Sequence, residues 1–359
     1  MRSKITNMSK RQMLLLEDDA VFPSTRFQGS KLKIAEWIWD AIKDLDFNTA
    51  LDAFGGTGSV GYVLKGKDKK VTYNDILKFN WHIGQALIEN DETKLSEEDV
   101  CFLLKKHNKV KYPAFIFDTF ENIYFTDEEN TWIDMVVTNI ARLDDIYKKA
   151  LAYFALFQAC IIKRPYNLFH RKNLYIRLSD VERNFGNKVT WDTPFEVHFR
   201  QFVAEANQAV FDNGQQNKAV NKDVFDIEGK FDLVYIDTPY VSKKGVGVDY
   251  FGFYHFLEGL VNYSEWGELI DFKTKHKRLR GSSSVWANKK QIYPAFERLF
   301  EKYKDSIIVV SYRSDGIPSI SELIEMLQKY KTNVEELRRK NYKYVLSTNN
   351  SDEVLLIGK

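Results

Sequence analysis

The segment TALDAFGGTGSVGYVL, residues 49–64, decides the fold class. Its short apolar run, Thr49 to Phe54, carries an acid near its end and leads into glycines, which predicts a buried strand that enters a tight turn. Ser59 to Leu64 can begin a helix directly after the turn. Glycines let the backbone turn sharply and approach a ligand at the carboxyl end of a strand. The segment therefore predicts an α/β domain with a ligand site at one sheet edge.

The loop from Asp52 to Gly58 also restricts the ligand. It lacks the Lys-Ser/Thr ending of a nucleotide-binding P-loop, so a P-loop is disfavoured. The carboxylate of Asp52 would repel a pyrophosphate and suits a cationic or amino-bearing ligand instead. Taken alone, the loop leaves two interpretations open, a site for a nucleotide-type ligand and an ordinary glycine-rich turn.

Strand and helix signals alternate on either side of this segment. Residues 71–75 are typical of a second strand and residues 77–89 of a second helix. After a long interruption the alternation resumes at residues 219–225. The remaining expected elements are helices at 31–45, 253–269, 291–303 and 319–330, strands at 231–236 and 306–312, and a terminal hairpin from 342–346 and 353–357.

The interruption divides the chain into three parts. Residues 1–95 form the first part of the α/β domain, residues 96–205 an insertion, and residues 206–359 the second part of the domain. Long helices are expected at 137–162 and 196–211, so the insertion is mainly helical. An insertion inside a doubly wound sheet usually recognises the substrate.

A second acid follows the second expected strand, where Val71-Thr72-Tyr73-Asn74 ends in Asp75. In this topology an acid at that position can accept hydrogen bonds from ribose hydroxyls. The alternative is a simple helix N-cap, because Asp is common there.

The sharpest chemical signal is Asp237-Thr238-Pro239-Tyr240, directly after the apolar run FDLVYI. An exocyclic amine is a poor nucleophile because its lone pair is delocalised into the ring. A carboxylate and a backbone carbonyl can bind its two N–H groups and direct the lone pair towards an electrophile, while a flat aromatic stacks on an extruded base. The sequence supplies all three groups. The alternative is a strand-end turn with a cap.

At this point the chain resembles the Dam-like, adenine-specific DNA methyltransferases of bacterial restriction–modification and phage systems. Four elements match in order. Arg26 to Lys31 (RFQGSK) resembles the amino-terminal R-[YF]-x-G-[GS]-K motif, and Asp52 to Gly58 resembles the D-x-F-x-G-x-G motif. Asp75 falls at the ribose-binding acid, and Asp237 to Tyr240 resembles the catalytic D-P-P-Y. Thr238 stands where the motif has its first proline and acts there through its backbone carbonyl.

The resemblance implies a Rossmann-like methyltransferase fold, S-adenosylmethionine as cofactor, and methyl transfer to N6 of a flipped adenine in a specific DNA sequence. It implies that the insertion is the target-recognition domain. The implied catalytic residues are Asp237, Thr238, Pro239 and Tyr240. The implied cofactor-binding residues are Arg26, Gly29, Lys31, Asp52, Phe54, Gly56, Gly58, Asp75 and Asp223.

Two basic stretches suit double-stranded DNA, although net charge is only +2. The first runs from Lys163 to Asn173 within the insertion, and the second from Lys273 to Arg280. Arg and Asn can read base edges, and Lys and Arg contact phosphates. The alternative for each stretch is a solvated basic loop. The expected DNA contacts are Arg164, Asn167, Arg171, Lys172, Lys277, Arg278 and Arg280.

Composition sets broad limits. Hydrophobic residues make up 44% of the chain, enough for a sizeable core. The two cysteines, Cys101 and Cys160, lack metal-ligand spacing, and neither a metal site nor a disulfide framework is expected. No apolar stretch is long enough to span a membrane, so we expect a cytoplasmic protein. The resemblance further implies a bacterial or phage origin and, as an expectation, a partner endonuclease that shares the DNA site.

Other chemistries fit less well. Methylation at carbon-5 of cytosine needs a cysteine nucleophile, usually after proline, whereas Cys101 follows valine and Cys160 follows alanine. The glycine spacing and Asp52 argue against a dehydrogenase. Methyltransferases for RNA or protein amides usually have Asn in the position of Asp237. A DNA-binding protein with a decayed active site stays open as an alternative, as does an RNA methyltransferase.

Overall fold

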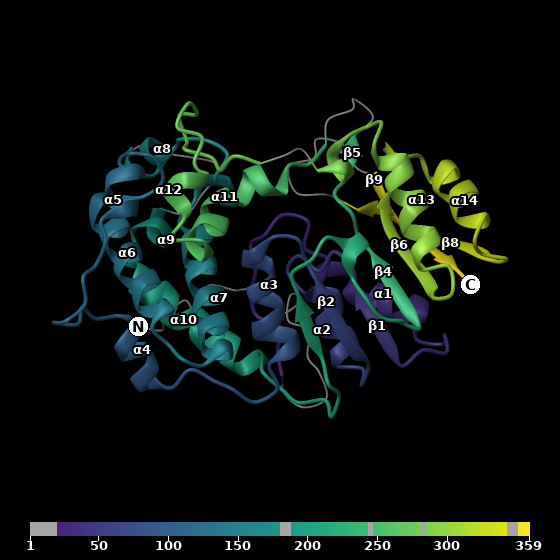
Figure 1. The fold of residues 1–359 in the computed structure, drawn as a ribbon, viewed down its shortest axis with the longest axis horizontal. Coiled ribbons are helices and arrows are strands. Elements are labelled where there is room, and N and C mark those ends of the chain that lie inside the picture. The colour runs from purple at the N-terminus through teal and green to yellow at the C-terminus, as the bar shows by residue number, and fades with distance from the viewer. Residues whose placement is uncertain (1–19, 180–187, 243–246, 282–283, 343–350) are drawn as a thin grey trace, which may run out of the picture.

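The computed structural model describes residues 20–179, 188–242, 247–281, 284–342 and 351–359. A seven-stranded sheet, built from both ends of the chain, organises one half of the fold and is flanked by helices (Figure 1). Five neighbouring strands are parallel, and the sixth in order, β9, runs antiparallel to both of its neighbours. The sheet order is β3 (Lys218–Val220), β2 (Lys70–Asn74), β1 (Thr49–Asp52), β4 (Leu233–Ile236), β6 (Ile307–Arg313), β9 (Ser351–Gly358) and β8 (Val334–Tyr342).

The central strands are buried on both faces, which explains their continuous apolar sequences. On β4, Leu233 and Tyr235 point into one core, whereas Val234 and Ile236 point into the other. The first core lies under η1 (Leu32–Ile34), α1 (Ala35–Ile42), α2 (Ser59–Lys65), α3 (Lys78–Gly84) and the π-turn η2 (Gln85–Glu89). The second lies under η4 (Val224–Asp226), η5 (Val285–Ala287), α13 (Ile292–Lys302) and α14 (Ile320–Gln328).

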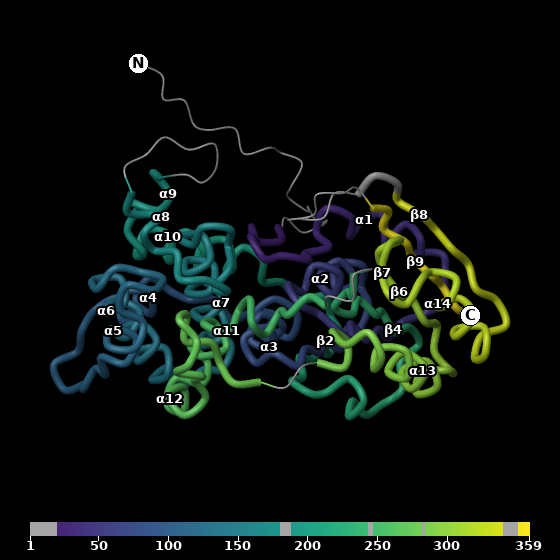
Figure 2. The backbone as a smooth tube through the Cα atoms, turned by 90° about the horizontal axis from the view of Figure 1, so that it is seen from above, coloured from purple at the N-terminus to yellow at the C-terminus, as the bar shows by residue number. Residues whose placement is uncertain are grey.

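A helical lobe lies beside the sheet, and Figure 2 shows the two halves side by side. Phe79 of α3 joins them, because its ring lies 5.8 Å from Phe157 of the lobe and 5.8 Å from Tyr254. The lobe and one face of the sheet therefore share a continuous core. The lobe contains α4 (Glu97–Leu103), α5 (Phe115–Thr119), α6 (Asp127–Ala141), α7 (Ile146–Ile162), η3 (Pro165–Asn167), α8 (Leu174–Leu178), α9 (Lys188–Asp192) and α10 (Phe195–Ala209).

Two later helices, α11 (Tyr250–Val261) and α12 (Trp266–Leu269), also pack into this lobe. Phe256 stacks on Phe169 at 5.0 Å, and Trp266 lies 5.0 Å from Phe120. The structure thus confirms the predicted α/β fold with inserted helices. It also places in the lobe residues that the sequence assigned to the second part of the α/β domain.

Some predicted elements differ from the structure. One helix was expected over 137–162, but α6 ends at Ala141 and α7 begins at Ile146, because the Asp145 side chain caps the backbone N–H groups of Tyr147 and Lys148. The helix expected at 253–269 is likewise divided between α11 and α12. The terminal hairpin exists, but its first strand, β8, ends at Tyr342; the part of that prediction at 343–346 lies outside the described residues.

A two-stranded sheet of β5 (Val241–Ser242) and β7 (Gly316–Ile317) follows the predicted catalytic turn. It ties the chain after Tyr240 to the chain after β6. Over the described ranges, the structure contains no helix whose length and apolar character would let it cross a membrane.

Candidate active site

Three acids lie at the same edge of the sheet. Asp52 ends β1, Asp75 follows β2, and Asp237 follows β4. Because β2, β1 and β4 are neighbouring parallel strands, their carboxyl ends meet at one edge. The sequence predicted each acid separately; the strand order brings the three together.

Asp52 is almost fully buried, with 1% of its surface exposed. Its Oδ2 accepts a hydrogen bond of 3.1 Å from the backbone N–H of Gly61, whereas its buried Oδ1 has no hydrogen-bond partner. Burial, together with the charges of Asp237 and Asp75, raises the pKa of Asp52 to about 8. The buried, unpartnered oxygen can accept a hydrogen bond from an amino-bearing ligand, one of the ligand types that the sequence indicated.

The glycines of the loop from Asp52 to Gly58 are required for two different reasons, backbone conformation and close packing. Gly56 and Gly58 have positive φ of 52° and 76°, which favours glycine. A Cβ on Gly56 would meet nothing closer than the Phe54 carbonyl oxygen at 3.9 Å, so open space lies beside it. A Cβ on Gly55 would overlap the ring of Tyr73. Packing against Tyr73 therefore requires glycine at position 55, which the sequence pattern did not indicate.

Asp75 holds the glycine loop in place. Its Oδ2 accepts hydrogen bonds from the Gly56 backbone N–H at 2.9 Å and from the Asn80 amide at 3.1 Å, and its Oδ1 accepts one from the Leu77 N–H at 2.8 Å. Burial raises its pKa to about 6, against the lowering effect of these donors. The helix N-cap that the sequence offered as an alternative is not found, because Leu77 is the residue that precedes α3 and no side chain caps that helix; the Leu77 contact is a local turn. The ribose contact stays a prediction.

Asp237 meets a lysine from the start of the fold. Lys31 Nζ lies 3.2 Å from Asp237 Oδ1, and the Tyr240 hydroxyl donates to the same oxygen at 2.8 Å. Lys31 Nζ also donates to the Tyr240 hydroxyl and, at 2.8 Å, to Glu353 Oε1 on β9. Lys31 was predicted to contribute to the cofactor pocket; the structure places its ammonium group against the predicted catalytic residues.

The rest of the catalytic turn is largely enclosed. Thr238 is buried and its Oγ1 has no hydrogen-bond partner, while Pro239 is half-buried. The Tyr240 ring is also buried and lies edge-on to Tyr312, at 5.1 Å. In this structure Tyr240 contacts Asp237 through its hydroxyl. Stacking of its ring on a base stays a prediction.

The other residues predicted to bind the cofactor have different local environments. Gly29 has a φ of 81°, and a Cβ there would overlap the Tyr250 hydroxyl. Phe54 lies edge-on to Trp286 at 5.1 Å. Asp223 is exposed and caps η4 by accepting from the Phe225 N–H at 3.0 Å. Arg26 is exposed.

Arg164 lies in the interior rather than on a DNA-facing surface. Only 1% of it is exposed, and its guanidinium donates to the carbonyl oxygens of Tyr124, Leu168 and Arg171 and to the Asn173 side chain. It also lies 4.4 Å from the Tyr124 ring centroid. A guanidinium engaged in this way holds its own loop together, so we withdraw the expectation that Arg164 contacts DNA.

The structure brings the two basic stretches together. The Tyr124 hydroxyl oxygen lies 2.6 Å from the Phe169 carbonyl oxygen and 2.8 Å from the His276 carbonyl oxygen, and its single proton can be donated to either. His255 Nε2 lies 2.8 Å from the same hydroxyl. Loop 163–173 and loop 271–280 therefore meet at one buried point. The predicted contacts with exposed or half-buried side chains on these loops are Asn167, Arg171, Lys172, Lys277, Arg278 and Arg280.

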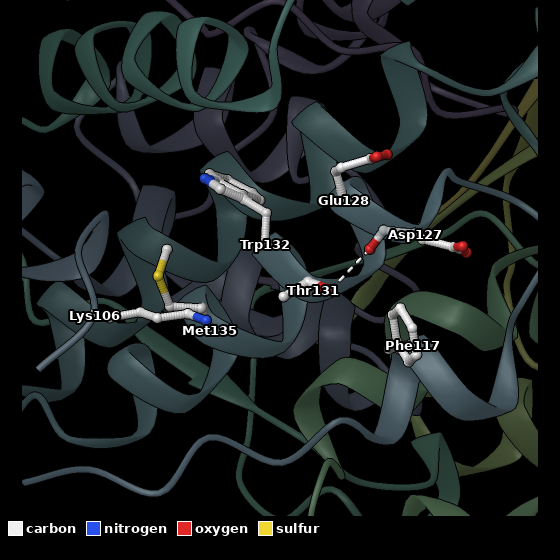
Figure 3. Close-up of a pocket in the computed structure, with 7 residues that line it drawn as sticks. All are labelled: Lys106, Phe117, Asp127, Glu128, Thr131, Trp132 and Met135. Atoms are coloured by element: carbon white, nitrogen blue, oxygen red, sulfur yellow. Dashed lines mark hydrogen bonds between the residues drawn. The ribbon is translucent and has the colours of Figure 1, made fainter. Parts of the chain in front are cut away.

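A separate pocket of about 500 Å³ lies on the helical lobe (Figure 3). Trp132, Met135 and Phe117 give it an apolar lining, and Asp127 and Glu128 place two acids at it. Its lining includes none of the predicted site residues. The two acids outnumber the one basic lining residue, Lys106, so the pocket does not favour binding of DNA phosphates.

Three residues that support the site were not predicted from the sequence. Tyr73 packs against the glycine loop, and its hydroxyl donates to the Gly56 carbonyl oxygen at 2.7 Å. Glu353 is fully buried beside Lys31. Tyr124 joins the basic loops. The only available signal was a charged residue, Glu353, immediately before the apolar run 354–357.

The mixed sheet, the glycine loop and the acids at three strand ends define a methyltransferase of the S-adenosylmethionine-dependent fold. A family model described as D12 class N6 adenine-specific DNA methyltransferase matches residues 27–326, and the chain belongs to that family. It is an enzyme that transfers a methyl group from S-adenosylmethionine to N6 of adenine in DNA. The sequence predictions of family, activity and cofactor are confirmed.

Similar proteins of known name are also methyltransferases. The chain is 32% identical to the Type II methyltransferase M2.HphI of Haemophilus parahaemolyticus, over 86% of this chain and 88% of the relative. It is 26% identical to the Modification methylase LlaI of Lactococcus lactis subsp. lactis over 91% of this chain, and 28% identical to the Type II methyltransferase M.FokI of Planomicrobium okeanokoites over 85%. The matches cover 52% and 47% of those two relatives, about half their length.

Proposed function

We propose that the chain is the modification enzyme of a restriction–modification system and methylates adenine within one short duplex sequence. The relatives named as a type II methyltransferase and a modification methylase support this proposal. An enzyme of this kind protects the sites that a partner endonuclease cuts. The proposed partners are therefore double-stranded DNA and such an endonuclease, and the proposed location is the cytoplasm, where bacterial DNA lies.

Sequencing of modified bases in DNA from a bacterial host that expresses the chain tests this proposal. We expect N6-methyladenine at nearly every copy of one short motif. Methylated adenines scattered without a shared motif would contradict site-specific modification.

The observation that carries the catalytic assignment is the position of Asp237 at the sheet's carboxyl edge, with 16% of its side chain exposed. Its contacts with Lys31 and Tyr240 fall on Oδ1. In our proposal Oδ2 accepts one N–H of the adenine amino group, and the Thr238 backbone carbonyl accepts the other. Together they direct the nitrogen lone pair towards the methyl donor.

The amino group must also lose one proton when the new C–N bond forms. We assign that proton to Asp237, the carboxylate that would already hold the N–H. Burial raises the pKa of Asp237 to about 6, while Lys31 opposes the rise. At neutral pH the carboxylate is therefore mostly ionised and more basic than an exposed aspartate.

S-adenosylmethionine supplies the methyl group when it is bound. We propose that the residues around the glycine loop hold it. The unpartnered Oδ1 of Asp52 suits an amino group, and the open space at Gly56 allows close approach to the backbone. The proposed cofactor-binding residues are Arg26, Gly29, Asp52, Phe54, Gly56, Gly58, Asp75 and Asp223.

For DNA we propose the joined surface of loops 163–173 and 271–280. Arg171, Lys172, Arg278 and Arg280 are exposed on it, and Tyr166 is 47% exposed beside them. Tyr166 and Asn167 have positive φ of 64° and 57°, a conformation that the anchored loop must hold against its intrinsic cost. Such strain is common where a loop presents side chains to a ligand.

Neutralising the second loop should weaken the salt dependence of DNA binding. We expect the triple variant Lys277→Ala, Arg278→Ala, Arg280→Ala to lower the slope of log affinity against log salt by about one for each lost phosphate contact. Titration of duplex DNA by fluorescence anisotropy at several salt concentrations measures this slope.

A matched control removes three lysines from the opposite edge of the sheet, Lys43, Lys67 and Lys70. Lys43 and Lys67 precede β1 and β2, and Lys70 begins β2. The control should keep the wild-type slope. Equal slopes in both triple variants and the wild type would show that loop 271–280 is only a solvated surface.

A further inference from the structure

The catalytic turn is joined by ion pairs to a second buried carboxylate, that of Glu353. Lys31 Nζ lies between Asp237 Oδ1, at 3.2 Å, and Glu353 Oε1, at 2.8 Å. Lys31 is buried and Glu353 has no exposed surface. One ammonium group thus faces two carboxylates, one directly after β4 and one on β9, more than a hundred residues apart in the sequence.

Glu353 occupies a position that apolar packing alone would not select. It pairs with Arg313 in the register of β6 and β9, and residues 354–357 after it belong to the apolar core. Its Oε1 also accepts a 2.5 Å hydrogen bond from the Ser311 hydroxyl. A buried carboxylate is costly unless it is paired and hydrogen-bonded, and Glu353 has both kinds of partner. Its contacts lead to Lys31 and, through Lys31, to Asp237.

We propose that Glu353 is a positioning residue for methyl transfer: it anchors the Lys31 ammonium group and shares its charge, so that Asp237 stays available to the adenine amine. This inference rests on the proposed role of Asp237. Without the Glu353 carboxylate, the charge of Lys31 would be balanced to a larger extent by Asp237. A full ion pair would make Asp237 a weaker acceptor for the amine and a weaker base for the proton.

The charges that face Asp237 fix the expected signs. Burial raises the pKa of Asp237, Lys31 lowers it, and Glu353 raises it. The further titratable groups near Asp237 are Asp52 of β1, Tyr235 of β4 and Tyr240. Because the ionised form of Asp237 is the reactive one, kcat/KM should rise with pH through about 6 in the wild type.

The test is the pH profile of kcat/KM for Glu353→Gln, which keeps the shape of the side chain without its charge. We expect the acidic limb to move to lower pH by about one unit, and the plateau to fall about tenfold. Lys31→Met should move the limb to higher pH. Asp232→Asn is the matched control, since Asp232 precedes β4 at the opposite edge of the sheet; its limb should not move.

The double variant Lys31→Met, Glu353→Gln removes one charge of each sign and so leaves no unpaired ion from that pair. Its limb should lie below that of Lys31→Met. A wild-type limb in Glu353→Gln, or equal limbs in the double variant and Lys31→Met, would overturn the inference. If Lys31→Met also kept the wild-type limb, the failure would lie with the proposed role of Asp237 itself.

Discussion

Replacing Asp237 by alanine should lower the single-turnover rate of adenine methylation by about a hundredfold or more. The substitution removes the carboxylate that we propose to orient the amine and to receive its proton. Binding of S-adenosylmethionine should change less, because the glycine loop and Asp52 are proposed to hold it. DNA binding should survive, because phosphate contacts dominate affinity.

The measurement is single-turnover transfer of labelled methyl groups to a duplex, with calorimetric titration of the cofactor and of DNA in parallel. Asp232→Ala is a matched control, because Asp232 directly precedes β4 and Asp237 directly follows it. Asp232 accepts hydrogen bonds from Asn48 and Thr49 at the opposite end of β4, so its loss should affect stability and leave the rate of the folded enzyme unchanged. A fully active Asp237→Ala enzyme would refute the catalytic assignment.

Alanine at two adjacent glycines should produce different effects. Gly55→Ala should lower the free energy of unfolding by about 3 kcal/mol, because its Cβ would overlap the ring of Tyr73. The ring of Tyr73 cannot move away freely, because Gly84 packs closely against its opposite edge. Gly56→Ala meets open space and should cost only about 1 kcal/mol for its positive φ.

The same pair separates packing from ligand binding. Gly56→Ala should weaken S-adenosylmethionine binding about tenfold, because its methyl group would enter the space proposed for the cofactor. Chemical denaturation gives the free energies of unfolding, and calorimetry gives the affinity. Wild-type affinity in a folded Gly56→Ala protein would remove this part of the loop from the cofactor site. A fully stable Gly55→Ala protein would contradict the packing account.

The parallel sheet could be predicted because its signals are local. The apolar runs before Asp52, Asp75 and Asp237 are short, buried on both faces and followed by turns or helices. Parallel strands place such residues at one edge, so the candidate site followed from the pattern. Strand order was needed only to show that the three acids are neighbours.

Features set by distant contacts could not be predicted. A basic stretch looks the same in sequence whether its arginines face solvent or the interior, and Arg164 turned inward because four oxygen acceptors and the Tyr124 ring surround it. Glu353 reaches the site only through the pairing of β9 with β6. The break at Asp145 was visible in principle, because aspartate is a common N-cap.

The most direct test of the account is identification of the methylated nucleoside. Duplex DNA is incubated with the enzyme and S-adenosylmethionine, digested to nucleosides and analysed by mass spectrometry, with RNA treated in parallel. The account predicts N6-methyladenine in DNA from the wild-type enzyme and at least about a hundredfold less product from Asp237→Ala under single-turnover conditions. A product on cytosine, a product in RNA alone, or equal N6-methyladenine from Asp237→Ala would contradict it.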